Sequence, residues 1–257
     1  MEFAYTMCFF VVSLHRLINK LGVGMRKMSL VWLFMSFFMF RVEAQSLKGA
    51  WEHKEGQKTT RLVADDAYVI VTEFSEAERT FFRTWGGTYT ISVQGQLAVN
   101  VEFDTKEPEA VAYIQTFSLK VKKKSLELQK MNFDRLDQGT ETPLAGNWRI
   151  TTRMQPDGSE VVMKPGPRKT VKLLTGSTFQ WVALNKETRE FFGSGGGRYT
   201  FLDGEYIETI QFFSRDASRV GAQLRFQAEV NDTTWIHSGK SSKGEPIREV
   251  WTKKKPD

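Results

Sequence analysis

The sequence predicts an all-β protein: two tandem antiparallel up-and-down β-barrels of about eight strands each, preceded by a signal peptide. Three observations lead to this prediction. A unit of about a hundred residues occurs twice in the chain. Within each copy, apolar residues recur at every second position in short runs that end at turn residues, as in β-strands. No segment after Ala44 has the sustained period of a helix.

The N-terminal region is predicted to be a leader rather than part of a barrel. We interpret residues 1–24 as an over-extended start, or alternatively as part of an unusually long leader. Residues 25–44 have the parts of a secretory signal peptide: a basic pair, an apolar run over 30–40, and small residues that end at Ala44. The apolar run is shorter than the roughly 20 residues that a transmembrane helix needs. We expect cleavage between Ala44 and Gln45, which exports the protein to the periplasm or the extracellular space.

Charge and composition exclude several classes of function. The formal net charge is +6, but residues 1–44 hold five Lys and Arg and two acidic residues, so the rest of the chain carries +3. Acidic and basic residues are interspersed along it, and we expect no nucleic-acid partner. The single cysteine, Cys8, excludes an internal disulfide framework. With three histidines and no spacing typical of metal ligands, we expect no metal and no cofactor.

The repeat is clearest around two motifs. LKGAW at 47–51 recurs as LAGNW at 144–148, and FFRTWGGTYTI at 81–91 recurs as FFGSGGGRYTF at 191–201. We therefore expect one barrel over 45–138 and a second over 143–257. The extra length of the second copy falls mostly in the loop at 156–167, where insertions are tolerated.

Each copy contains enough short runs for eight strands in a meander. A meander of that length usually closes into a barrel, because closure leaves no exposed edge. The glycines at 86–87 and 195–197 lie inside long runs, where glycine is typical of a bulge. The runs of the first copy lie near Trp51 and over 61–64, 68–74, 81–93, 97–103, 111–121, 126–131 and 135–136.

A Gly-x-Trp motif on the first strand of such a meander resembles the lipocalin signature, and the chain carries it twice, as Gly49/Trp51 and Gly146/Trp148. In that family the Trp closes one end of the barrel, often beneath a basic side chain of the last strand. The resemblance implies this cation–π role for Arg135 and Arg248. Each copy is shorter than a typical lipocalin and lacks the Thr-Asp-Tyr loop motif and the disulfide. The chain therefore looks more like the lipocalin-like domains of small secreted bacterial proteins.

Differences between the copies predict a binding site in the second barrel. Positions that are aliphatic in the first copy and aromatic, polar or smaller in the second are expected to face the interior in both. Strand parity also places such residues on shared faces. We expect the first barrel to be filled with hydrocarbon and the second to be hollow and polar. The aligned pairs are Leu97/Tyr206, Val99/Glu208, Leu126/Trp235, Leu128/His237, Ile70/Trp181 and Leu119/Ala228.

These residues favour a secreted or periplasmic binding protein over an enzyme, without fixing its oligomeric state. The expected partner is a small, partly apolar ligand such as a lipid, a pigment or a glycan fragment. Glu208 and His237 would hold its polar group by hydrogen bonds. The aromatic walls would come from Trp181, Tyr206, Trp235 and Trp251.

Alternatives remain open at this point. Glu208 and His237, with Tyr206, could act as acid and base in a lyase or isomerase. The same residues could form a satisfied buried network, or Glu208 could lie at the rim against Arg225. Both barrels could also be closed and packed, with a protein-interaction surface outside. His53 aligns with Ile150 and is interpreted as a satisfied core histidine.

Overall fold

The computed structural model describes residues 46–155, 157–241 and 244–254. The expected over-extended start at 1–24, the expected signal peptide at 25–44 and the cleavage site at Ala44–Gln45 lie outside the described residues.

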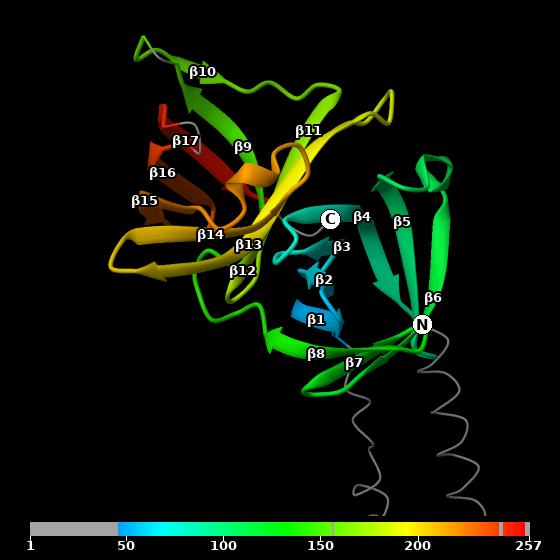
Figure 1. Ribbon diagram of the computed structural model, residues 1–257. Coiled ribbons are helices and arrows are strands. Elements are labelled where there is room, and N and C mark those ends of the chain that lie inside the picture. Colours follow the sequence, from blue (N-terminus) through cyan, green and yellow to red (C-terminus); the bar gives the residue numbers. More distant parts are fainter. Residues whose placement is uncertain (1–45, 156, 242–243, 255–257) are drawn as a thin grey trace, which may run out of the picture. The chain divides into compact units, whose positions relative to one another are not determined.

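The chain forms two closed antiparallel β-barrels in tandem, as the sequence predicts (Figure 1). In the first barrel consecutive strands pair from β1 to β8, and β1 also pairs with β8, which closes the sheet. In the second, β9 pairs with both β11 and β17. The strands of the first barrel are β1 (Gly49–Glu55), β2 (Lys58–Ala64), β3 (Tyr68–Ser75), β4 (Thr80–Ile91), β5 (Gln96–Asp104), β6 (Ile114–Val121), β7 (Ser125–Leu128) and β8 (Met131–Asp137). Those of the second are β9 (Gly146–Met154), β11 (Arg168–Leu174), β12 (Thr178–Asn185), β13 (Phe191–Leu202), β14 (Glu205–Phe213), β15 (Gln223–Val230), β16 (Thr234–Lys240) and β17 (Pro246–Lys253).

Local details differ from the sequence-based expectation. An additional strand, β10 (Glu160–Val162), pairs with β9 in the loop that lengthens the second copy. The run at 126–131 is not one strand: Gln129 and Lys130 have φ of 47° and 71° and form the tight turn between β7 and β8. The described helices are single 3-10 turns, η1 (Pro108–Ala110) and η2 (Ala217–Arg219), and neither is long or apolar enough to span a bilayer.

The glycines inside β4 and β13 lie at bulges, which confirms their interpretation. The register of β4 against β5 shifts between Gly86 and Gly87, and that of β13 against β14 shifts between Gly196 and Gly197. A Cβ atom on Gly87 would collide with the carbonyl oxygen of Asn100, so the close approach of the strands requires glycine there. Because a bulge bends its strand, these long strands follow the curved barrel wall.

The first strand of each barrel carries a fully buried tryptophan, Trp51 on β1 and Trp148 on β9. The indole N–H of Trp51 donates to the carbonyl oxygen of Leu47 at 2.8 Å, and that of Trp148 donates to Leu144 at 2.7 Å. The Arg135 guanidinium lies 3.7 Å from the centroid of the Trp51 ring, within the range of a cation–π contact.

The basic partner of Trp148 is Lys253 and not Arg248, so the assignment of Arg248 is wrong. Trp148 is paired in register with Lys253, as Trp51 is with Arg135, and the Lys253 ammonium lies 5.2 Å from the Trp148 ring. Arg248 lies near the start of β17, opposite Ser238 of β16. Its guanidinium pairs with Glu160 of β10 at 2.5 Å. The longer turn between β16 and β17 displaces the alignment of the two last strands, which is why the sequence comparison selected Arg248.

The two barrels pack against each other through β2–β5 and β11–β14. A shared apolar cluster combines Val63, Ile70 and Phe103 with Val171, Leu173 and Val182. Beside it, the buried Gln180 amide nitrogen donates to the hydroxyl of Thr72 at 2.7 Å and lies 3.1 Å from those of Thr84 and Ser194.

Asp137, at the end of β8, links the first barrel to the second. One carboxylate oxygen accepts from the backbone N–H groups of Ala50 and Gly139 at 3.1 and 3.0 Å. The other accepts from the Thr175 hydroxyl at 2.8 Å and from the backbone and hydroxyl of Ser177 at 3.0 and 2.7 Å. Thr175 and Ser177 lie in the turn between β11 and β12 of the second barrel.

Substitution Asp137→Ala is expected to destabilise the protein by roughly 3 kcal/mol, because it leaves buried donors of both barrels without their charged acceptor. The measurement is urea unfolding followed by tryptophan fluorescence. Asp66→Ala is the matched control: its carboxyl is 58% exposed and pairs with Lys48, so its loss is expected to stay within about 0.5 kcal/mol. Equal losses of unfolding free energy for the two variants would contradict the role given to Asp137.

Candidate functional site

The interior of the second barrel carries polar groups where the first barrel has aliphatic ones. Tyr206 pairs in register with Phe226 as Leu97 pairs with Phe117, so Tyr206 and Glu208 replace Leu97 and Val99. His237 likewise takes the place of Leu128, because their strand partners Ala228 and Leu119 correspond.

One of the aligned pairs is wrong by one residue. Trp181 lies opposite Gly195 as Val71 lies opposite Trp85, so the counterpart of Trp181 is Val71 and not Ile70. Ile70 corresponds to Gln180, and both belong to the contact between the barrels. The inward position of Trp181 nevertheless holds, since it lines the cavity described below.

A lysine and a glutamate form a buried ion pair across the barrel interior. The Lys172 ammonium lies 2.6 Å from Glu208 Oε1, and each side chain is only 7% exposed. The Tyr206 hydroxyl donates to the same oxygen at 2.7 Å, and burial raises the pKa of Tyr206 well above its ordinary value, so the phenol stays protonated. Lys172 is not among the residues that the sequence comparison found. Its register position, opposite Trp148, is that of Leu62 in the first barrel.

Four aromatic rings surround the ammonium of Lys172. Its nitrogen lies 4.9 to 5.7 Å from their centroids, which is within cation–π range. The ammonium is thus compensated by Glu208 on one side and by ring faces on the others, as a buried charge requires. The rings belong to Phe179, Tyr206, Trp235 and Trp251.

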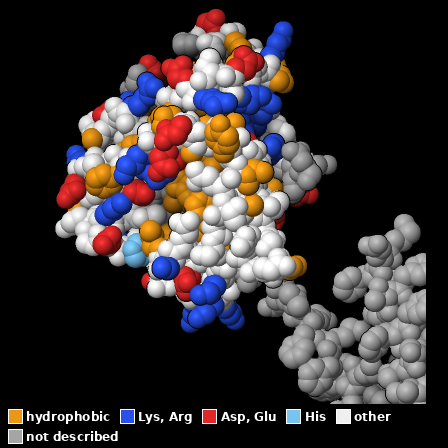
Figure 2. All heavy atoms as spheres, turned by 90° about the vertical axis from the view of Figure 1, so that its right-hand side faces the viewer, with side chains coloured by type: hydrophobic (Ala, Val, Ile, Leu, Met, Phe, Trp, Pro, Cys, Tyr) orange, Lys and Arg blue, Asp and Glu red, His pale blue; other side chains and the backbone are white. Residues whose placement is uncertain are grey.

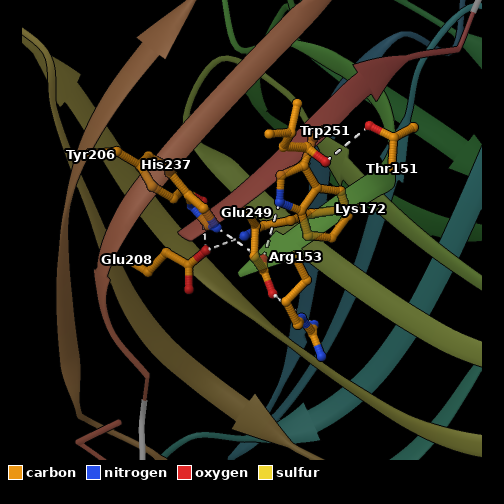
Figure 3. A network of polar contacts seen from close by, with 9 residues as sticks. Thr151, Arg153, Lys172, Tyr206, Glu208, His237, Glu249 and Trp251 are labelled. Carbon is orange, nitrogen blue, oxygen red and sulfur yellow. Dashed lines mark hydrogen bonds and ion pairs between the residues drawn. The ribbon is translucent and has the colours of Figure 1, made fainter. Parts of the chain in front are cut away.

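A second polar group centres on Glu249 of β17 (Figure 3). One of its carboxylate oxygens lies 3.0 Å from His237 Nε2 and accepts from the Trp251 indole N–H at 3.1 Å. The other accepts from Arg153 at 2.6 Å. Although burial alone would raise it, the pKa of Glu249 is lowered to about 2 by the His237 hydrogen bond and the nearby positive charges. Glu249 and Arg153 are also absent from the sequence-based set.

The protonation of His237 follows from these contacts. Burial lowers the pKa of His237 below its ordinary value of 6.5, so the ring is neutral near pH 7. Because ionised Glu249 can only accept, Nε2 must carry the proton. Nδ1 is then a lone-pair acceptor, and it is buried without a hydrogen-bond partner among the described residues. The indole N–H of Trp235 is likewise buried, as a donor without a hydrogen-bond partner among the described residues.

These groups lie at the bottom and on the side of a cavity of about 310 Å³ in the second barrel. Four of the six predicted ligand-binding residues line it: Trp181, Glu208, His237 and Trp251. Tyr206 and Trp235 do not, which corrects their predicted role as walls: both are fully buried and pack edge to face at 5.1 Å beneath the cavity. The remaining lining residues are Arg153, Arg168, Thr170, Lys172, Phe179, Ala183, Gly196, Ile210, Phe213, Leu224, Phe226, Ser241, Ile247 and Glu249.

Other expectations are settled by the same geometry. Glu208 does not lie at the rim against Arg225, because Arg225 pairs with Glu205 at 3.3 Å. His53 lies against Phe133, and its Nδ1 is 2.7 Å from the carbonyl oxygen of Asn132, so it is satisfied structurally. The first barrel is not filled to its mouth, since it contains a cavity of about 370 Å³. Within the described residues no group of three or more His, Cys, Asp or Glu side chains is placed to hold a metal ion.

Comparison with known proteins finds a similarity among solved structures. No family model matches the chain, and no curated protein matches it either. Among solved structures, the chain is similar to a lipocalin-like protein from Bacteroides uniformis, with a TM-score of 0.34 and 12% sequence identity, over 44% of this chain and 100% of that one. The two closed eight-stranded barrels fit the lipocalin-like expectation.

When Lys172 and Glu208 are replaced by their first-barrel counterparts, the effects of the two substitutions on the free energy of unfolding are expected to be coupled. Lys172→Leu alone or Glu208→Val alone leaves one buried charge unpaired and should destabilise by about 3 kcal/mol or more, whereas the double variant should lose less than either. The measurement is a double-mutant cycle by urea unfolding. The exposed pair Arg225 and Glu205, changed to Leu and Val, is the matched control and should lose less than about 1 kcal/mol. If the losses of stability from Lys172→Leu and Glu208→Val simply add in the double variant, the expected energetic coupling of the ion pair is contradicted.

Stability is expected to fall on acidification in two steps. The folded pKa of His237 lies below 6.5, so the unfolded chain binds the proton first and stability is lost as the pH falls below 6.5. The folded pKa of Glu249 is about 2 against an ordinary 4.5, so a further contribution of about 3 kcal/mol is lost between those values. Thermal unfolding from pH 8 to 2 measures both steps. His237→Leu should flatten the curve between pH 6.5 and 5, and an unchanged slope there would refute the assignment.

Proposed function

We propose that the protein is a binding protein whose second barrel holds a small ligand, with a hydrogen-bond-donating end on the polar floor and an apolar part toward the mouth. The observation that carries this proposal is an unused acceptor on a residue that lines the cavity, Glu208 Oε2. Beside it, His237 Nδ1 is buried without a partner among the described residues and is not open to the cavity. Glu208 accepts from Lys172 and Tyr206 through Oε1 alone, and no hydrogen bond in the described structure uses Oε2.

Apolar side chains line the cavity beside these polar groups. Trp181, Leu224 and Ile247 are among them, and Trp181 packs edge to face on Phe213 at 5.4 Å. A volume of about 310 Å³ is at the lower end of the range for drug-sized ligands. A lipid fragment or a small pigment with a hydroxyl or amide group fits this combination.

The two alternative functions, a protein-interaction module and an acid–base enzyme, differ in how well they fit the cavity of the second barrel. A protein-interaction module with closed, packed barrels does not fit a second barrel that contains a cavity. The acid–base alternative meets its first requirement, because Glu208 and His237 line one cavity. In that cavity, however, Glu208 is held by Lys172 and Tyr206, and His237 by Glu249. These contacts already occupy Glu208 Oε1 and His237 Nε2, which suits binding better than proton transfer.

The proposed setting is outside the cytoplasm. The basic pair, apolar run and small residues at 25–44 support export to the periplasm or the extracellular space. Detection of a mature N-terminus at Gln45 by mass spectrometry of the secreted protein would support it, and retention of residues 25–44 would contradict it.

The binding proposal is tested with matched amphiphiles. We expect decan-1-ol to bind residues 45–257 and to change the fluorescence of Trp181 and Trp251, whereas its methyl ether should bind about tenfold more weakly because it cannot donate to Glu208 Oε2. Isothermal titration calorimetry gives the affinities.

Two variants separate specific binding from loss of fold. Glu208→Gln keeps the size of the side chain and an oxygen for Lys172 and Tyr206 but turns the unused acceptor into an amide donor, and it should abolish the preference for the alcohol over the ether. Glu205→Gln, on the same strand as Glu208 but exposed at the surface, should leave both affinities unchanged. Equal binding of alcohol and ether to the unsubstituted protein would contradict the proposal.

A further inference from the structure

The first barrel has its own cavity at the position equivalent to that of the second. The strand registers align Thr60 with Thr170 and Val71 with Trp181, and both members of each pair line their cavities. Phe117 and Phe226 correspond in the same way. This cavity of about 370 Å³ is as large as that of the second barrel.

The polarity of the two cavities is reversed. In the second barrel the polar groups Lys172, Glu208 and His237 lie at the positions of Leu62, Val99 and Leu128 in the first. In the first barrel the floor is apolar, and the polar groups occur toward the rim, where Glu73 and Gln115 replace Ala183 and Leu224. Figure 2 shows the side of the molecule that carries β5 and β6, with hydrophobic side chains at its centre and charged ones around them.

Aromatic rings and unpaired neutral polar groups meet in this cavity. Trp85 and Phe117 pack at 5.1 Å and form one wall. The Trp85 indole N–H, the Thr60 hydroxyl and the Gln115 amide make no hydrogen bond within the described part of the chain. Trp85 and Thr60 are only 8% and 7% exposed, yet neither polar atom is sealed from solvent, so both reach the cavity.

The charged groups of the same cavity are already neutralised. The Arg83 guanidinium binds Asp104 at 2.5 Å and Glu107 at 3.1 Å, and Glu73 binds Lys58 at 2.5 Å. A ligand therefore finds neutral donors and acceptors beside Trp85 and Phe117, while the charged groups of the cavity are paired with one another. A sugar ring has this complement, since its C–H face stacks on an aromatic ring and its hydroxyl groups both donate and accept.

We propose that the first barrel is a second binding site, for a neutral saccharide that stacks on Trp85 and hydrogen-bonds to Thr60 and Gln115. This site does not depend on the function proposed for the second barrel, because the two cavities share no lining residue.

The test uses saturation-transfer NMR and calorimetry on residues 45–257 with cellobiose, maltose and N,N′-diacetylchitobiose. At least one of these sugars is expected to bind. Gln115→Leu, which installs the second-barrel residue, and Trp85→Phe, which keeps the site filled, should each weaken that binding about fivefold or more. Trp181→Phe, in the other cavity, should leave it unchanged.

Each result decides the proposal. Binding that depends on Trp85 and Gln115 but not on Trp181 supports it. No binding of any of the three sugars overturns it, as does sugar binding that Trp181→Phe removes. Decanoic acid that binds in a Trp85-dependent way would also overturn it, because the site would then hold an acyl chain. The decan-1-ol measurements are read separately, so failure of one site leaves the other interpretable.

Discussion

The Lys172–Glu208 ion pair constrains the whole second barrel. Two opposite charges, each 7% exposed, lie where the first barrel has leucine and valine. Removing such charges from water is unfavourable unless each finds compensation, so the surrounding residues must supply it. Tyr206 adds a hydrogen bond to Glu208, and four ring faces surround the ammonium. The aromatic content of this barrel is therefore the consequence of a polar floor.

The duplication shows that one closed sheet supports either kind of interior. The buried Trp on the first strand, the bulged glycines and the inward alternation are the same in both copies. What differs is where polarity lies: at the rim in the first and on the floor in the second. In the second barrel Lys172 and Glu208 are paired, whereas His237 Nδ1 is a buried acceptor without a partner among the described residues, which lowers the stability of the folded barrel.

Sequence reasoning reached the fold because periodicity and duplication act over many residues. Two closed barrels follow from period-two alternation and the repeat, and the inward positions of Glu208 and His237 follow from the comparison of the two copies together with strand parity. Errors arose where a one-residue difference matters. Trp181 was paired with Ile70 instead of Val71, and Arg248 was chosen over Lys253 because the β16–β17 turn is longer than its counterpart. Lys172 and Glu249 were missed, although the correct registers set them against Leu62 and Met131.

The contact between the barrels determines the geometry of both cavities. On β3 and β4, Thr72 and Thr84 face the other barrel while their neighbours Val71 and Trp85 face inward. On β12, Gln180 faces the first barrel and Trp181 faces its own cavity. Since adjacent residues of a strand point to opposite sides, the hydrogen bonds that fix Gln180 between Thr72 and Thr84 also fix the inward side chains beside them. The cavity walls are thus preformed by the interface, as binding without large rearrangement requires.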